Sequence, residues 1–301
     1  AGTNWSSIYT TINSANLILK HTPEISFTNE ATRSEVMANA YFLRAYCYFT
    51  LVRVFGDCPL LTSGFESEKQ EDMYPSRTAA SEVYAQVETD IEEALRLMPA
   101  SSKLLHKASP AAINMLRTEY YLWKAKRLGG GNAALSTAQS SVDAVLKAGY
   151  ALLPTFADIF NLNNEANSEL IWTLPYIVNE NVTPGTSPNF FAYYLAPNGD
   201  RTRLREAGYT EDEVPAGSHA QYVVPTQAYC DFLAEDARDT RTDVSVRVFE
   251  DKFLTEEVQI KRMVVKFKGS FANDTRRFDS DVHVYRLAEA YLLKAEVENA
   301  L

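Results

Sequence analysis

Hydrophobic residues in the first half of the chain recur at spacings of three and four, the period of an amphipathic helix. From Trp5 to Lys20, the residues Ile8, Ile12, Ala15 and Leu19 make one apolar stripe. The same periodicity predicts four more helices, over residues 29–55, 77–98, 109–128 and 132–148. We expect these five helices to pack as a series of antiparallel hairpins.

The expected helix ends carry recognisable local signals. Thr28 or Asn29 is placed to cap the second helix, and Ser109 caps the fourth with Pro110 in its first turn. Gly129 to Gly131 follow the fourth helix, and Gly149 stops the fifth. Small residues recur among large ones, as in tetratricopeptide-like helix pairs, although no clean repeat of about 34 residues is present.

The second helix ends abruptly in the stretch Tyr41–Leu61. Arg44 and Arg53 are nine residues apart, roughly two and a half turns, so they point to opposite sides of the helix. We predict that each arginine bonds helix-end carbonyls or an acid on a neighbouring helix, because buried charges need partners. Gly56 lets the chain turn after Phe55. The expected inward stripe of this helix is Ala38, Phe42, Ala45, Phe49 and Val52.

The middle of the chain has a different composition, because prolines and asparagines are frequent from residue 155 to about residue 226. In that region only Glu169–Tyr176 resembles a strand, and a short helix is expected within Tyr222–Ala234. Arg247–Phe271 then has the pattern of a strand pair. A loop region this long is usually functional or disordered, and its aromatic content argues against disorder.

These patterns predict a mainly α fold: a tetratricopeptide-like scaffold of helix pairs with an irregular, loop-rich ligand-binding part that contains a few short strands. We expect the scaffold over residues 1–150, the loop-rich insertion with the ligand site over residues 151–280, and a late scaffold helix over residues 281–301. The three parts form one unit.

Composition narrows the function. The 301 residues carry a formal net charge of -10, which argues against a nucleic-acid surface. The three cysteines form no C-x-x-C and the four histidines are scattered, so neither a metal site nor a disulfide framework is predicted. No phosphate-binding, dinucleotide or hydrolase motif occurs, so we predict no cofactor, no catalytic residue and no enzyme. The acids Asp90, Glu92 and Glu93 are interpreted as a solvated helix face.

The loop region combines aromatic rings with amides and charged groups, a mixture that suits a carbohydrate. We interpret Phe156, Phe160 and Trp172 as core, because their neighbours are apolar. For Phe190, Phe191 and the tyrosine pair that follows them, core packing and ligand contact both stay open. The predicted ligand-binding residues are Tyr74, Tyr176, Phe190, Phe191, Tyr193, Tyr194, Asn198, Asp200, Arg201 and Tyr209.

Six segments in sequence order resemble the SusD/RagB family of Bacteroidetes outer-membrane nutrient-binding lipoproteins. The most distinctive is YFLRAYCYFTLVRVFGDCPLL, which resembles the signature helix of that family. The others are WSSIYTTINSANLIL, RTAASEVYAQVETDIEEAL, ASPAAINMLRTEYYLWKAK, VLKAGYALLPTFADIFNLNNEANSELIWTLPY and VYRLAEAYLLKAEVENAL. Their order and spacing agree with the family over most of the chain.

The resemblance implies a cell-surface protein that binds an oligosaccharide or another nutrient without cleaving it. It also implies a lipid anchor on the extracellular face of the outer membrane and import through a SusC-like TonB-dependent transporter. The lipidated cysteine and the segment that follows the late helix in the family are absent, so we expect a fragment that lacks both ends. Membrane attachment is expected only through that anchor outside this chain.

Two alternatives to a glycan-binding protein remain open. One is a helical-repeat scaffold that binds a peptide or protein and has no glycan ligand, and the other is a glycan-degrading enzyme. The resemblance transfers no binding residue, because these vary among members of the family.

Overall fold

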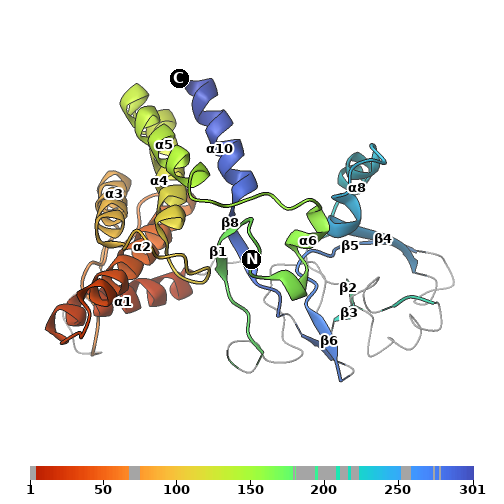
Figure 1. The fold of residues 1–301 in the computed structure, drawn as a ribbon, viewed down its shortest axis with the longest axis horizontal. Coiled ribbons are helices and arrows are strands. Elements are labelled where there is room, and N and C mark those ends of the chain that lie inside the picture. The colour runs from red at the N-terminus through yellow and green to blue at the C-terminus, as the bar shows by residue number, and fades with distance from the viewer. Residues whose placement is uncertain are drawn as a thin grey trace. The chain divides into compact units, whose positions relative to one another are not determined.

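In a computed structural model, the structure describes residues 5–67, 75–178, 180, 194–195, 208–210, 216–217, 224–251, 259–273, 275–277 and 279–301. Contacts divide the chain into two compact units (Figure 1). The helical unit comprises Ala1–Tyr150 and Tyr285–Leu301, and the mixed unit comprises Ala151–Val284. Each unit is described by itself below.

The helical unit is a succession of paired helices. Helix α2 packs against α1 and α3, helix α4 packs against α5, and helix α10 returns to pack against α5 and α4. The bounds are α1 Ser6–His21, η1 Thr22–Glu24, α2 Glu30–Phe55, α3 Ala80–Leu97, α4 Pro110–Arg127, α5 Gly131–Leu146 and α10 Leu287–Ala300. The prediction of a mainly α fold built from helix pairs is confirmed, with helix ends within a few residues of those expected.

Local capping explains where these helices begin and end. The side chain of Asn29 accepts a hydrogen bond of 2.8 Å from the backbone N–H of Ala31, and Ser109 accepts one of 3.1 Å from Ala112. Gly56 has a φ of 68° at the end of α2, a conformation that favours glycine. The predicted caps at Asn29 and Ser109 and the turn at Gly56 are therefore confirmed.

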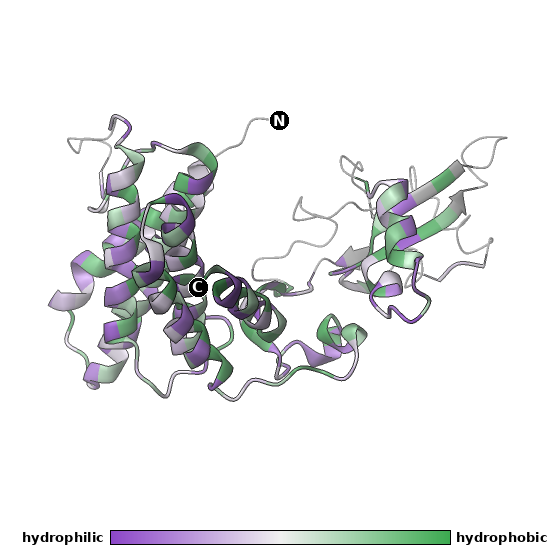
Figure 2. Ribbon diagram, turned by 90° about the horizontal axis from the view of Figure 1, so that it is seen from above, coloured by the Kyte–Doolittle hydropathy of each residue, from purple (hydrophilic) through white to green (hydrophobic). Residues whose placement is uncertain are grey.

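The core of the helical unit lies along the inward stripes of its helices. Green and purple bands alternate along each helix in Figure 2, because hydrophobic residues recur at the helical period. Helix α2 contributes its whole predicted stripe, and Phe42 and Phe49 are almost completely buried. Tyr48 and Tyr120 are the largest side chains in this core.

Arg44 and Asp90 correct one sequence-based interpretation. Asp90 was expected on a solvated face, but it is 0% exposed and accepts two hydrogen bonds from Arg44, of 2.8 and 2.7 Å. Helical geometry gives the reason: Asp90 lies three residues after Val87 and so shares the inward face of α3.

The arginine prediction itself is confirmed. Arg44 finds its acid on α3, whereas Arg53 on the opposite side of α2 approaches Glu119 of α4, with 3.9 Å between Nη1 and Oε1. Arg53 also donates a hydrogen bond of 3.3 Å to the backbone carbonyl of Phe49.

The mixed unit contains short helices and small two-stranded sheets. Strands β4 and β5 are antiparallel, with a register from Val246 opposite Val264 to Asp251 opposite Gln259. Strands β6 and β7 form an antiparallel hairpin, β2 and β3 pair in parallel, and β1 pairs with β8. The bounds are α6 Phe156–Ile159, η2 Leu162–Asn164, β1 Leu170–Leu174, β2 Tyr194–Leu195, β3 Ala216–Gly217, α8 Gln227–Ala234, α9 Thr242–Ser245, β4 Val246–Asp251, β5 Gln259–Val264, β6 Ser270–Ala272, β7 Thr275–Arg277 and β8 Val282–Arg286.

The sequence predicted four of the twelve elements just given. The strand within Glu169–Tyr176, the helix within Tyr222–Ala234 and the strand pair within Arg247–Phe271 are confirmed as β1, α8 and β4–β5. Strands β2 and β3 were missed, because two residues are too few to establish an alternating pattern. Within the described part of the chain, no helix combines the length and apolarity needed to cross a bilayer.

Candidate functional site

A cavity of about 870 Å³ lies within the mixed unit. Its wall is built from α6 and η2, from the residues at the α9–β4 junction, and from the chain between the end of β5 and β6. Thr210 contributes from a further segment. Ligand cavities in proteins commonly span roughly 300–1,000 Å³, so this one is large enough for an organic ligand of several rings.

Asparagine and threonine caps shape the first wall. The hydroxyl of Thr155 accepts a hydrogen bond of 3.3 Å from the backbone N–H of Asp158, which starts α6. Asn161 then accepts one of 3.0 Å from the N–H of Asn163, which starts η2. Each of these helices is about one turn long, and Phe160, Asn161 and Asn163 line the cavity.

An aromatic cluster surrounds Phe160 on its other sides. The Phe160 ring stacks on His283 with centroids 5.2 Å apart and an interplanar angle of 23°. It meets Phe156 and Phe267 edge-on, at 5.1 and 5.3 Å. The ammonium of Lys266 lies 5.2 Å from the centre of the same ring. One aromatic face is thus held beside the cavity by several neighbours.

This cluster changes the core interpretation of three aromatic residues. Trp172 is 2% exposed, as predicted. Phe156 and Phe160 are only half-buried, and Phe160 lines the cavity, so interpreting these two as core was wrong. The reason is that α6 has four residues and is too short to cover both rings.

The α9–β4 junction and the chain after β5 add charged side chains to the lining. Asp243 comes from α9, Arg247 from β4, and Lys268 from the segment after β5. Together with the exposed amides of Asn161 and Asn163 they provide donors and acceptors around an aromatic surface. Such a wall can bind a polyhydroxylated ring by hydrogen bonds while Phe160 packs on its C–H face.

Of the ten predicted ligand-binding residues, Tyr209 is nearest in sequence to a cavity residue. Its ring packs edge-on against Phe249 at 5.9 Å, and Thr210 beside it lines the cavity. Tyr176 is half-buried, donates its backbone N–H to Asp281 at 3.0 Å and does not line the cavity. The backbone of Tyr194 is part of β2, and its side chain is not among the described parts of the structure. Tyr74, Phe190, Phe191, Tyr193, Asn198, Asp200 and Arg201 lie outside the described residues.

Sequence reasoning missed Asp243, Arg247 and Lys268. For Lys268 the available signal was the alternation of basic and apolar residues over Lys261–Ser270, which is typical of a strand with one basic face. That pattern does not indicate where the strand ends. Strand β5 ends at Val264, and Lys268, which lines the cavity, lies in the chain after it. In the described part of the chain, no cluster of His, Cys, Asp and Glu is arranged to hold a metal ion.

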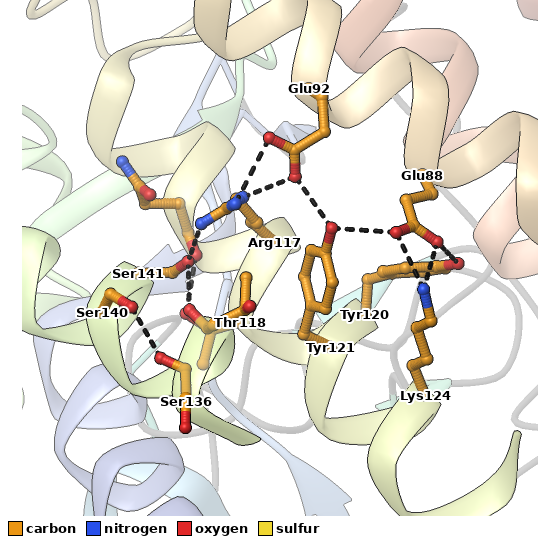
Figure 3. A network of polar contacts seen from close by, with 12 residues as sticks. Glu88, Glu92, Arg117, Thr118, Tyr120, Tyr121, Lys124, Ser136, Ser140 and Ser141 are labelled. Atoms are coloured by element: carbon orange, nitrogen blue, oxygen red, sulfur yellow. Dashed lines mark hydrogen bonds and ion pairs between the residues drawn. The ribbon is translucent and has the colours of Figure 1, made fainter. Parts of the chain in front are cut away.

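A second polar cluster lies in the helical unit, between α3 and α4 (Figure 3). The hydroxyl of Tyr121 lies 3.0 Å from a Glu88 oxygen and 3.1 Å from a Glu92 oxygen. Lys124 forms an ion pair with Glu88, and Arg117 forms one with Glu92, both at 2.7 Å.

The electrostatics of this cluster favour a structural role. Burial raises the pKa of Glu88, but hydrogen bonds from Lys124, Tyr120 and Tyr121 outweigh burial and hold that pKa below its ordinary value. An acid that donates a proton to a glycosidic oxygen needs a raised pKa instead. We therefore interpret the cluster as a polar connection between helices and the cavity as the candidate ligand site.

Comparisons with known proteins give a consistent result. Residues 1–121 match a SusD-like family described as "Starch-binding associating with outer membrane". SusD-like protein P25 of Formosa agariphila is 26% identical over 99% of this chain and 58% of its own length. The chain thus spans little more than half of that relative.

Solved structures agree with the sequence comparisons. NanU of B. fragilis superimposes with a TM-score of 0.83 at 26% identity, covering 99% of this chain and 61% of that one. A laminarin-binding SusD-like protein superimposes with a TM-score of 0.70 at 21% identity, covering 98% of this chain and 66% of that one. At that lower identity the second likeness shows the fold alone.

Proposed function

We propose that the chain is a member of the SusD-like family and that it binds an oligosaccharide in the cavity of its mixed unit. The observation that carries the proposal is that a half-buried aromatic ring, Phe160, lines one cavity together with amide and charged groups. The family description names starch, and one structural neighbour is named for laminarin, so glucans are the first ligands to test.

The chemistry of the wall suits a sugar. A pyranose ring has an apolar C–H face and a rim of hydroxyls that both donate and accept hydrogen bonds. Phe160 offers the flat partner for the face, Asn161 and Asn163 offer both donor and acceptor, and Arg247 offers several donors. A volume of about 870 Å³ accommodates more than one sugar ring.

We extend the proposal to the whole protein, of which this chain spans only a part. The full-length protein is anchored by a lipid at the extracellular face of the outer membrane and passes its oligosaccharide to a SusC-like TonB-dependent transporter. The protein captures the glycan and does not cleave it. The support for these statements, including the anchor and the transporter, is the likeness to the SusD-like family.

The binding proposal is tested by isothermal titration of the full chain with malto-oligosaccharides and laminari-oligosaccharides. Phe160→Ala should weaken the binding of whichever glucan binds the wild type by about tenfold or more, since stacking on an aromatic ring contributes roughly 1–3 kcal/mol. Phe232→Ala is the matched control, because that ring is 66% exposed on α8 and does not line the cavity.

Equal affinity in the wild type and a folded Phe160→Ala variant would remove the cavity from the ligand site. Binding of a peptide library with no glycan binding would favour the helical-scaffold alternative. Release of reducing ends from either glucan by the purified protein would revive the enzyme alternative.

A further inference from the structure

Phe267 has an unusual backbone conformation beside the candidate site. Its φ is 51°, in the left-handed region that bulky side chains avoid because Cβ crowds the neighbouring carbonyl. Among the described residues other than glycine, only Asn273 shares a positive φ, also of 51°. Asn273 lies in the tight turn between β6 and β7, where asparagine is a favoured residue. Turn chemistry explains Asn273, but it does not explain an aromatic residue at position 267.

Phe267 lies in a turn between two residues that line the cavity. In an extended strand, residues two apart share a face, so Val265 would point with Phe267 and away from Lys268. Lys266 and Phe267 instead form a turn after β5, which breaks the alternation, and Val265 and Lys268 on either side both line the cavity. The Phe267 ring itself does not line it and instead contacts Phe160 and His283.

These contacts enclose the Phe160 ring. Phe267 meets Phe160 at 5.3 Å and 88°, and meets His283 at 5.1 Å and 75°. His283 stacks on Phe160 in turn at 5.2 Å. Phe160 sits at the end of the four-residue helix α6, so little regular structure orients its ring. The orientation of Phe160 therefore depends on the two rings packed against it.

We propose that Phe267 is a positioning residue, which holds the ring of Phe160 in the orientation that presents its face to the sugar. This inference rests on the proposed function of the cavity and adds to it a residue that does not touch the ligand. Strain in the backbone is retained at functional sites when the surroundings over-determine it, as three mutually packed rings do here. A ring fixed before binding also loses less conformational freedom when the sugar arrives.

Variants at position 267 distinguish the contribution of the aromatic ring from that of the backbone conformation. Phe267→Asn and Phe267→Gly both accept a positive φ, so they keep the turn and remove only the ring. Phe267→Tyr keeps the ring and is the rescue variant. Asn273→Gly is the matched control, because it changes the other left-handed residue and leaves the aromatic cluster intact.

The first measurement needs no ligand. With 4-fluorophenylalanine at position 160, the wild type, Phe267→Tyr and Asn273→Gly should give one shifted ¹⁹F resonance. Phe267→Asn should move that resonance towards the position of the unfolded chain while the melting temperature of the helical unit stays the same. An unmoved resonance in both Phe267→Asn and Phe267→Gly would overturn the positioning role.

The second measurement is titration with the laminari- or malto-oligosaccharide that binds the wild type. Phe267→Asn should weaken binding about threefold to tenfold, the usual value of one aromatic pair, and Phe267→Tyr should restore it. In the Phe160→Ala background the loss from Phe267→Asn should vanish, because the residue acts through Phe160. Additive losses would overturn the inference. If neither glucan binds the wild type, the proposed ligand class fails, while the ¹⁹F result still decides the role of Phe267.

Discussion

Glu119 on α4 accepts a hydrogen bond of 2.6 Å from the phenol of Tyr285, although 166 residues separate the two in the sequence. Tyr285 is 2% exposed and lies in β8, two residues before the start of α10. Burial raises the pKa of Glu119, and the hydrogen bond from Tyr285 and the charge of Arg53 partly offset that rise. The pair fixes the chain to the helix scaffold where it returns from the mixed unit.

Removing the phenol should therefore destabilise the helical unit. Tyr285→Phe leaves the buried Glu119 carboxyl without this donor, and we expect the free energy of unfolding to fall by about 1–3 kcal/mol. Denaturant unfolding followed by circular dichroism measures the change. Tyr291→Phe on α10 is the control, because that residue is 52% exposed. Equal stability of the two variants would show that the 2.6 Å contact contributes nothing.

Glu289 should make the stability of the helical unit depend on pH. Burial, and then the nearby Glu119, raise the pKa of Glu289 from 4.5 to about 7. Between these two values the folded state keeps a proton that the unfolded state has lost. Stability is therefore fully present below about pH 4.5 and declines as the pH rises towards 7. We expect a loss of the order of 2 kcal/mol, since partial exposure screens part of the effect.

Glu289→Gln should flatten that decline, because the amide does not titrate. Glu298→Gln is the matched control, since its side chain is 55% exposed and pairs with Lys294. Urea unfolding at several pH values between 4.5 and 8 distinguishes the variants. An identical slope in the wild type and Glu289→Gln would assign the pH dependence to other groups.

The buried pair of Arg44 and Asp90 should be costly to break and easier to replace. Arg44→Met leaves an unpaired carboxylate in the core, which should cost about 3–5 kcal/mol of stability. The double variant Arg44→Met with Asp90→Leu should recover much of that loss, because no buried charge remains.

Arg96→Ala is the comparison for this pair. Arg96 pairs with Glu93 on the surface of α3, and its side chain is 63% exposed, so we expect no measurable change in stability. Thermal unfolding of the four proteins decides the matter. If the double variant is no more stable than Arg44→Met, the unpaired carboxylate of Asp90 is not the cause of the lost stability.

The contact of Tyr193 and Tyr194 with a glycan stays a prediction from the sequence. Changing both to alanine should weaken oligosaccharide binding by about 1–3 kcal/mol if their rings stack on the ligand. The affinity of this double variant should be measured alongside that of Phe160→Ala. Weaker oligosaccharide binding in both variants indicates one extended site that includes the cavity. Unaltered affinity in a folded double variant would remove the tyrosines from it.

The sequence by itself determined the helices and the main strand pair. Each helix is encoded by a period of 3.6 residues and by caps such as Asn29 and Ser109, which act within a few residues of the chain. Strands β4 and β5 follow from a similar local alternation. These patterns can be recognised without knowledge of the fold, because their physical cause is the geometry of the neighbouring backbone.

Only the tertiary structure decided where charges and ligand groups meet. Asp90 has the composition of a solvated acid, and its burial depends on Arg44, which lies 46 residues earlier. Phe160, Asp243 and Lys268 line one cavity although about a hundred residues of chain separate the first from the last. Their proximity, like the left-handed turn at Phe267, results from packing between distant segments, and no local pattern of hydrophobic and polar residues encodes such contacts.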